Sequence, residues 1–291
     1  MTNHPAVAAN RVAVVTGAAS GIGLAAATRF AVLGMKVCMA DANAKALKAA
    51  SALISTLTAR ADYVLPLVAD VGKVEDVQRL KTAAYDAFGE VAVLMNNAGT
   101  AGGGGLFDKP DNWRRTIEVN LWGVIHGVQI FGPDMIKQGS PSAIVNTGSK
   151  QGITCPPGDT AYNVSKAGVK VVTEALAHEL RNIKGCRVSA HLLIPGFTFT
   201  GMTAGSKKKK PAGAWTADQV VDFMLSSMAA GDFYILCPDN DVNHELDARR
   251  ILWAAGDVIE NRPPLSRWHP DYKDTFFEFS KPRREARSSG R

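Results

Sequence analysis

The sequence predicts an α/β fold: one doubly wound domain with a seven-stranded parallel sheet flanked by helices on both faces. Short apolar, β-branched segments alternate with longer segments of helical periodicity, a pattern typical of parallel sheets. No internal repeat or second domain is visible along the 291 residues. The composition, 46% hydrophobic and 21% charged, is that of an ordinary globular protein able to bury a substantial core.

Seven segments have the length and composition of buried strands. Right-handed crossovers between parallel strands place helices on both faces and favour the strand order 3-2-1-4-5-6, with the seventh strand beyond the sixth. Pro66 supports this order, because proline cannot donate to a ladder and is tolerated at a sheet edge, where the third strand would lie. The predicted strands are 11–16, 36–40, 63–68, 91–96, 143–147, 187–194 and 233–237.

Helical periodicity fills the intervals between these strands. Gly34 and Gly89 are predicted to end the first and third helices, since glycine readily adopts the left-handed conformation that follows a helix. The predicted helices are 21–33, 43–58, 73–88, 111–137, 160–183, 216–228 and 243–259.

The composition also limits the class of protein. No amino-terminal segment resembles a leader and no apolar stretch is long enough to span a bilayer, so we expect neither secretion nor a membrane partner. The four cysteines have no zinc-ligand spacing, which favours free thiols in a reducing cytoplasm and no bound metal. They are Cys38, Cys155, Cys186 and Cys237.

The net charge of +6 is partly concentrated in Lys207–Lys210 and in residues 281–291. A solvated loop and a free terminus explain these charge runs better than an anionic partner does, and no motif supports nucleic-acid binding.

A glycine-rich turn, Thr16 to Gly23, joins the first predicted strand to the first helix. Glycines allow the backbone to turn tightly and approach a pyrophosphate, whose charge the helix amino terminus stabilises. The alternative is a plain strand-to-helix turn. Asp41 ends the second strand, where a carboxylate can accept hydrogen bonds from ribose hydroxyls and repel a 2′-phosphate, although it could instead cap the next helix. The sequence therefore predicts a Rossmann-type domain that prefers NAD to NADP.

Further polar and glycine residues follow the later strands in a fixed order. They are Asp70, the run Asn96-Asn97-Ala98-Gly99, Asn120, Ser149, the pair Tyr162-x-x-x-Lys166, and Pro195-Gly196. Together with the glycine turn, this pattern resembles the short-chain dehydrogenase/reductase family in its single-domain form, from about residue 11 to residue 200. The family's Val-Asp-Gly-Gly ending is absent, and an aromatic-rich carboxyl-terminal tail replaces it.

Tyr162 and Lys166 are four residues apart on a predicted helix, so their side chains share a face, and an ammonium next to a phenol favours the phenolate. The resemblance implies that Tyr162 exchanges a proton with the substrate oxygen and that Ser149 polarises that oxygen. It also implies that Lys166 lowers the tyrosine pKa and holds the nicotinamide ribose, while Asn120 positions a water. Ser149 could instead cap a turn, and Asn120 could only satisfy helix backbone.

The resemblance also implies two sets of binding residues. The expected NAD-binding residues are Gly17, Ser20, Gly21, Ile22, Gly23, Asp41, Asp70, Val71, Asn97, Ala98, Gly99, Tyr162, Lys166, Pro195, Gly196, Thr198 and Thr200. The expected substrate-binding residues are Ser149, Gln151, Tyr162, Phe197 and Met202. Lys150 could meet an anionic substrate group, although an outward, solvated side chain is favoured. We expect Cys155 to line the pocket rather than to act as a nucleophile.

The expected function is that of an NAD-dependent oxidoreductase that interconverts a small-molecule secondary alcohol and a ketone by hydride transfer. The alternatives are an epimerase or dehydratase of the same family that retains NAD, and a non-catalytic nucleotide-sensing protein. The two long helices contain more apolar positions than one buried face needs, such as Trp122 and Val171. The resemblance implies that these helices pair between subunits, so we expect a homodimer or homotetramer.

The expected domain boundaries follow from these assignments. Residues 1–10 are a flexible amino terminus, and residues 11–240 form the dinucleotide-binding catalytic domain, with a mobile lid at about 197–215. Residues 241–280 form a helical extension that packs on the same domain or on a neighbouring subunit, and residues 281–291 form a disordered basic tail.

Overall fold

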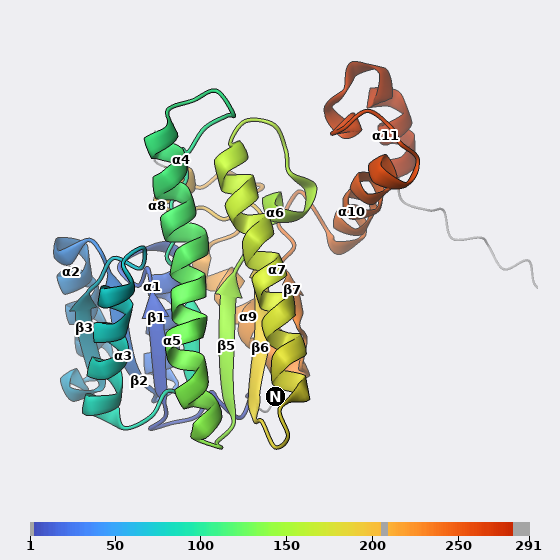
Figure 1. Ribbon diagram of the computed structural model, residues 1–291. Helices are drawn as coiled ribbons and strands as arrows, with labels where there is room; N and C mark the ends of the chain where they lie inside the picture. The colour runs from blue at the N-terminus through green and yellow to red at the C-terminus, as the bar shows by residue number, and fades with distance from the viewer. Residues whose placement is uncertain (1–2, 205–208, 282–291) are drawn as a thin grey trace, which may run out of the picture.

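The computed structural model describes residues 3–204 and 209–281. Its centre is a seven-stranded parallel sheet in the order β3-β2-β1-β4-β5-β6-β7, which confirms the predicted fold class and places Pro66 in the edge strand (Figure 1). The strands are β1 (Val12–Thr16), β2 (Lys36–Asp41), β3 (Val64–Val68), β4 (Val93–Asn96), β5 (Ser142–Thr147), β6 (Val188–Ile194) and β7 (Tyr234–Leu236).

Helices cover both faces of this sheet, as right-handed crossovers require (Figure 1). One face carries α1 (Gly21–Val32), α2 (Ala44–Thr58) and α9 (Ala217–Ala230). The other face carries α3 (Val74–Phe88), α5 (Gly123–Lys137) and α7 (Thr160–Asn182), with α4 (Pro110–Ile117) leading into α5. The short helices α6 (Gln151–Thr154) and α8 (Gly201–Ala204), which the periodicity did not predict, follow the ends of β5 and β6.

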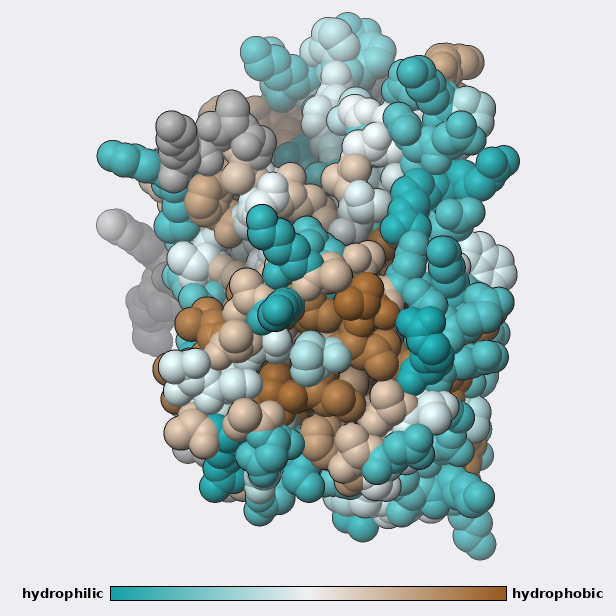
Figure 2. Space-filling model, turned by 90° about the vertical axis from the view of Figure 1, so that its left-hand side faces the viewer, coloured by the Kyte–Doolittle hydropathy of each residue, from teal (hydrophilic) through white to brown (hydrophobic). Residues whose placement is uncertain are grey.

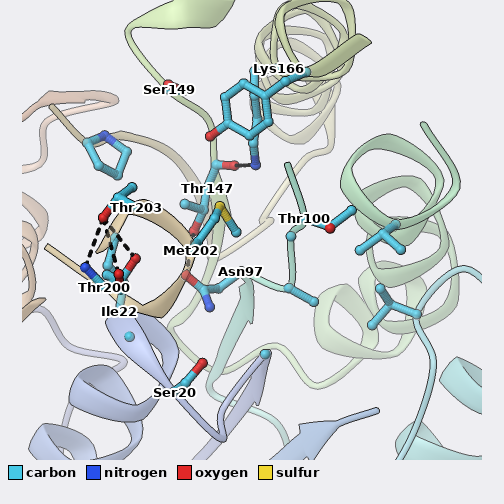
Figure 3. A pocket seen from close by; sticks show the side chains of 18 of the residues that line it. Ser20, Ile22, Asn97, Thr100, Thr147, Ser149, Lys166, Thr200, Met202 and Thr203 are labelled. Carbon is cyan, nitrogen blue, oxygen red and sulfur yellow. Dashed lines mark hydrogen bonds between the residues drawn. The ribbon is translucent and has the colours of Figure 1, made fainter. Parts of the chain in front are cut away.

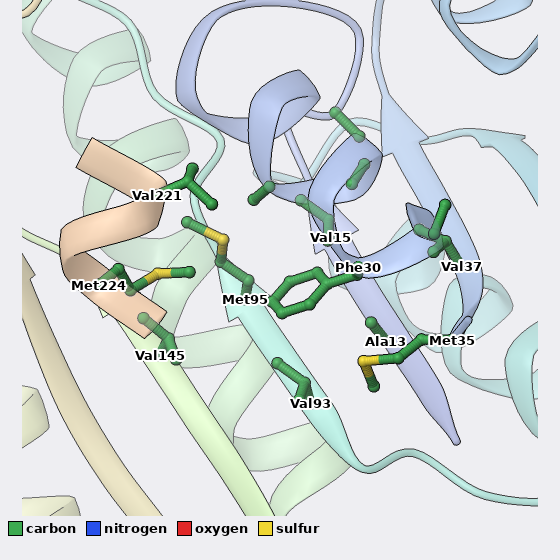
Figure 4. Close-up of a cluster of buried hydrophobic side chains, with 14 of the residues drawn as sticks. Ala13, Val15, Phe30, Met35, Val37, Val93, Met95, Val145, Val221 and Met224 are labelled. Carbon is green, nitrogen blue, oxygen red and sulfur yellow. The ribbon is translucent and has the colours of Figure 1, made fainter. Parts of the chain in front are cut away.

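The two hydrophobic cores form because alternate residues of each strand point to opposite faces. Ala13 and Val15 of β1 pack beneath α1 with Phe30, whereas Val14 between them packs on the other face (Figure 4). Phe30 is fully buried, so replacing it with alanine would leave a cavity in this core.

The predicted single helix over 111–137 is two helices joined by a π-helical turn, Glu118–Trp122. Asn120 lies in this turn with no exposed surface. Sequence periodicity does not reveal such a turn, because it spans only five residues and periodicity is read over windows of about 11 to 18 residues.

The β3 edge of the sheet carries an apolar area among hydrophilic side chains (Figure 2). Exposed large hydrophobic residues in this part of the fold include Leu53 and Leu57 of α2 and Val68 of β3.

The amino-terminal residues differ from the expectation of flexibility. Ala6 and Val7 are 0% and 3% exposed and belong to the core beneath α1 and α9. The guanidinium of Arg11 also joins this end of the chain to Glu90, whose carboxylate oxygen lies 2.8 Å away. The described part of the amino terminus is therefore packed.

The carboxyl-terminal extension contains α10 (His244–Ile259) and α11 (Lys273–Ser280), and it projects beside the sheet domain (Figure 1). It has a small aromatic core of its own: the Trp253 ring lies 5.3 Å from Phe276 and 5.1 Å from Phe279, and its indole donates to the Ser266 hydroxyl at 2.7 Å. Within this chain α10 contacts α6, the short helix after β5.

Two expectations fall partly outside the described residues: the Lys207–Lys210 run, of which Lys209 and Lys210 are described, and the tail beyond residue 281. Among the helices of the described ranges, none is both long and apolar enough to cross a membrane.

Candidate active site

A cavity of about 350 Å³ opens at the carboxyl ends of the strands, the edge at which open parallel sheets bind ligands. It extends from the glycine turn after β1, past the loops after β2, β3 and β4, to the amino-terminal part of α7 (Figure 3). Figure 3 shows Lys166 reaching down toward Thr147, with Ser20 and Ile22 at the opposite end.

The glycine turn is shaped for a close approach of backbone and ligand. Gly17 has a φ of +67°, which favours glycine, and a Cβ on Gly23 would lie 2.2 Å from the carbonyl oxygen of Gly17. The side-chain amide of Asn97 donates to the Thr16 carbonyl at 3.1 Å and so fixes the turn to the loop after β4. Such a cradle, placed before α1, fits the pyrophosphate of a dinucleotide.

Asp41 lies beside this turn. One of its carboxylate oxygens accepts the Ala19 amide at 3.0 Å, and the other accepts the Asn43 amide at 2.9 Å. The cap of α2 is Asn43, whose side chain accepts from the Ala46 amide, so Asp41 is not the helix cap. Its charge faces the cavity, where it fits the hydroxyls of an adenosine ribose.

The other side of the adenosine end carries a charge that the sequence did not indicate. Arg115 of α4 lines the cavity, and its guanidinium lies 2.9 Å from the carboxylate of Asp70. Asp70 also accepts the Gly72 amide at 3.0 Å. Because this carboxylate already balances Arg115, the guanidinium does not offset the charge of Asp41.

Tyr162 and Lys166 share one face of α7, as their spacing predicts. The Lys166 ammonium lies 5.7 Å from the centre of the Tyr162 ring and donates to the Thr147 carbonyl at 2.8 Å (Figure 3). Lys166 is 4% exposed, and burial lowers its pKa to about 8. An ammonium this deep in the fold loses its hydration and releases its proton more readily.

The pKa of Tyr162 is shifted in the opposite direction to the expectation. Burial raises it, because the phenolate is poorly solvated, and a hydrogen bond from Ser149 only partly offsets that effect. The Lys166 ammonium does not outweigh this effect of burial on the Tyr162 pKa, because it lies 5.7 Å from the centre of the ring and donates to the Thr147 carbonyl instead.

Asn120 braces the site rather than lining it. Its amide group donates to the Thr100 carbonyl at 2.8 Å and to the Ser165 hydroxyl at 3.0 Å, and its oxygen accepts the Thr100 amide at 2.7 Å. Ser165 in turn donates to the Tyr162 carbonyl at 2.7 Å. Both amide hydrogens are therefore used, and of this side chain only one oxygen lone pair is left for a relay water.

Ser149 follows β5 and lines the cavity, and its hydroxyl accepts the Gln151 amide at 3.1 Å. The favoured expectation for the next residue, Lys150, is wrong. Its side chain is 17% exposed and paired with Asp239 and Asp247, because those carboxylates come from distant parts of the chain that fold against this loop.

The cavity brings together most of the residues that the sequence singled out. All of the expected NAD-binding residues line it except Gly23, which lies buried behind the turn. Of the expected substrate-binding residues, Ser149, Tyr162 and Met202 line it, whereas Gln151 and Phe197 are exposed and do not.

Cys155 does not line the cavity either, and burial raises the pKa of its thiol, which does not suit a nucleophile. Thr198 is 4% exposed and donates to the Gly196 carbonyl at 3.3 Å. Its hydroxyl therefore adds no polar surface to the site. The two ends of the predicted lid are hydrogen-bonded to each other, since the Trp215 amide donates to the Phe197 carbonyl at 2.9 Å.

Several lining residues had no sequence signal. Thr100 and Thr147 contribute backbone groups, which the sequence does not distinguish, and Thr203 orients the loop by donating to the Thr198 carbonyl and accepting the Thr200 amide. Arg115 lies only five residues before Asn120, but it belongs to none of the quoted motifs and follows no strand, so the sequence did not single it out.

Comparison with known proteins supports the geometry. A family model described as short chain dehydrogenase matches residues 11–211. A 1-deoxy-11-beta-hydroxypentalenate dehydrogenase from Streptomyces exfoliatus is 37% identical over 231 residues, covering 77% of this chain and 82% of the relative. A 2-(R)-hydroxypropyl-CoM dehydrogenase from Xanthobacter autotrophicus is 36% identical over 198 residues, covering 67% of this chain and 77% of the relative.

Among solved structures, a short chain dehydrogenase/reductase from Burkholderia phymatum in complex with NAD has a TM-score of 0.79 and 33% identity, covering 89% of this chain and 97% of that one. The matched region contains the glycine turn, Ser149, Tyr162 and Lys166. The chain belongs to the short-chain dehydrogenase family.

Proposed function

We propose that this protein is an NAD-dependent oxidoreductase that interconverts a secondary alcohol and a ketone. The observation that carries the proposal is the presence of the Tyr162 and Ser149 hydroxyls in the same cavity as the glycine cradle and Asp41. The relatives named above act, by their names, on hydroxylated small molecules, and the similar solved structure holds NAD. The substrate is a small molecule that enters between Ser149 and Met202.

Bound NAD supplies the acceptor for the hydride that leaves the carbinol carbon. Ser149 donates a hydrogen bond to the substrate oxygen and orients it toward Tyr162, which takes the hydroxyl proton during oxidation and returns it during reduction. Lys166 binds the nicotinamide-side ribose, and its charge stabilises the phenolate that forms. Asn120 holds the Thr100 loop and, through Ser165, the first turn of α7.

The preference for NAD over NADP rests on Asp41. A 2′-phosphate would approach a carboxylate already fixed by two backbone amides, with the nearest lining guanidinium, that of Arg115, engaged by Asp70. Repulsion between these like charges disfavours the phosphorylated cofactor.

A homodimer or homotetramer is the proposed assembly. Trp122, next to α5, and Val164 and Val171, on α7, are exposed by 49%, 46% and 61%, and these elements lie side by side on one face of the sheet (Figure 1). Apolar side chains in that arrangement suit an isologous helix pair.

The test is cofactor reduction by purified protein, with NAD or NADP, against secondary alcohols of increasing size and including carboxylated ones. Turnover with NAD would support the proposal. Racemisation or loss of water without net cofactor reduction would favour the epimerase or dehydratase alternative, and tight NAD binding with no reaction of any kind would favour a sensor.

A further inference from the structure

Three buried charged side chains lie directly behind the cavity and outside the machinery described above. The Lys150 ammonium is 2.5 Å from a carboxylate oxygen of Asp247 and 3.5 Å from one of Asp239. The Lys150 side chain is 17% exposed, and both carboxylate side chains are 5% exposed. We call these three residues the Lys150 cluster. Each of them belongs to a different element, and together they contact the two loops after β5 and β6, which line the cavity.

The first element is the catalytic serine loop. Lys150 follows Ser149, its amide donates to the Pro195 carbonyl at 3.4 Å, and its own carbonyl accepts the amides of Ile153 and Thr154 at 3.1 Å. The backbone that presents the Ser149 hydroxyl is therefore continuous with the residue whose side chain enters the cluster.

The second element is the loop after β7, where Asp239 lies against the loop after β6. Asp239 accepts the Phe197 amide at 3.1 Å with the same oxygen that faces Lys150. A Cβ on Gly196, which lines the cavity, would lie 2.5 Å from that oxygen and 2.9 Å from the Lys150 nitrogen. The cluster therefore packs directly against the backbone that forms the floor of the site.

The third element is the carboxyl-terminal extension. Asp247 lies in the first turn of α10, and the aromatic core around Trp253 lies further along the extension. Its pairing with Lys150 joins the amino-terminal end of α10 to the serine loop. Removing the Lys150 cation would leave Asp239 and Asp247 repelling each other across its place, with Asp247 still facing the charges of Arg250 and Arg267.

We propose that Lys150, Asp239 and Asp247 are positioning residues that hold Ser149 and the Gly196–Phe197 backbone in the geometry needed for turnover, and that through them the carboxyl-terminal extension is a working part of the site. The expected effect on kcat rests on the proposed oxidoreductase function, whereas the positioning of the backbone does not. The cluster contacts backbone and not the adenosine end of the cavity. Its loss is therefore expected to change catalysis more than NAD binding, because Gly196 is the one expected NAD-binding residue against which it packs.

The test compares Lys150→Met, which keeps the length but removes the charge, with Lys150→Arg, which keeps the charge. The matched control is Arg11→Met, because the Arg11 side chain is similarly buried, at 16% exposure, and pairs with Glu90 on the sheet domain without lining the cavity. Two readouts are taken with NAD present: hydrogen exchange of peptides that span residues 195–199, and kcat and KM for the alcohol.

Lys150→Met should raise exchange at 195–199 and lower kcat by about tenfold or more, since small displacements of reacting groups are costly, with the Kd for NAD within about threefold of the parent. Lys150→Arg should restore most of the kcat. Arg11→Met should lower thermal stability without either effect. If Lys150→Met does not fold, Asp247→Asn, which keeps the side-chain shape, should shift both readouts in the same direction.

The proposal is overturned if exchange at 195–199 in the Lys150 or Asp247 variant equals that of Arg11→Met, or if kcat is unchanged while only stability falls. Hydrogen exchange needs no substrate. If no alcohol reacts with the parent protein, the proposed function fails, and the exchange result still decides whether the cluster positions the loop.

Discussion

Asp41→Asn should move the cofactor preference from NAD toward NADP. The carboxylate of Asp41 lies at the adenosine end of the cavity, held by the Ala19 and Asn43 amides at 3.0 and 2.9 Å. Asparagine has nearly the same shape but keeps only one oxygen acceptor, so the negative charge disappears and one of these two amide hydrogen bonds is lost.

The magnitude follows from electrostatics at a half-buried position. Two unit charges about 4 Å apart repel by about 1 kcal/mol in water and about 4 kcal/mol at an effective dielectric constant of about 20. Taking about 2 kcal/mol, affinity for NADP should rise about 30-fold. Affinity for NAD should fall about 5-fold, because the ribose hydroxyls lose a charge-assisted hydrogen bond worth about 1 kcal/mol more than a neutral one.

The assay is calorimetric titration of both cofactors, with kcat/KM for each where a substrate is known. Asp134→Asn is the control, because Asp134 pairs with Lys81 at 2.7 Å and does not line the cavity. An unchanged ratio of NADP to NAD affinity in Asp41→Asn would refute the placement of the adenosine ribose beside this carboxylate.

Three further predictions test the cradle, the buried lysine and the assembly. Gly23→Ala should abolish calorimetric NAD binding and lower Tm, because its Cβ would lie 2.2 Å from the Gly17 carbonyl oxygen, whereas Gly132→Ala, which meets nothing within 4 Å, should do neither; equal NAD affinities would refute this account of the turn. Lys166→Met should be more stable than the parent by about 3 kcal/mol at pH 7, where the parent buries an ammonium whose pKa is lowered from 10.5 to about 8. The pKa of Lys166 in the folded protein, about 8, is below its usual 10.5, so the parent gains stability as the pH rises between these two values. The stability advantage of Lys166→Met should therefore vanish over that range, and identical Tm profiles against pH for the two proteins would refute this prediction. Trp122→Glu should shift the protein toward monomer in size-exclusion chromatography, since it places a charge in the proposed interface, and an unchanged elution volume would place the interface elsewhere.

Much of the fold could be predicted because the signals are local. The strands around the glycine turn alternate with helices over short distances, and their register follows from burial on both faces. Asp41 and Ser149 were found for the same reason: Asp41 ends β2, Ser149 comes two residues after β5, and the carboxyl ends of parallel strands meet at one edge.

What could not be predicted depends on contacts between distant residues. Lys150 looked like a solvated loop lysine, because its partner Asp239 comes 89 residues later and belongs to no motif. The π-helical turn at Asn120 is invisible to periodicity, although it directs that side chain toward the Thr100 loop and Ser165. The direction of the Tyr162 pKa shift was not predicted either. Sequence spacing identifies Lys166 as the neighbour of Tyr162, but it does not show that both side chains are buried.

The most direct test of the central claim is hydride transfer to NAD from a secondary alcohol deuterated at the carbinol carbon, measured in the parent protein and in Tyr162→Phe. The account predicts deuterium in the reduced nicotinamide, and a loss of at least about a thousandfold in kcat for the variant, whose NAD affinity and Tm stay close to the parent's. Substantial turnover by Tyr162→Phe, or reduced cofactor without the label, would contradict it.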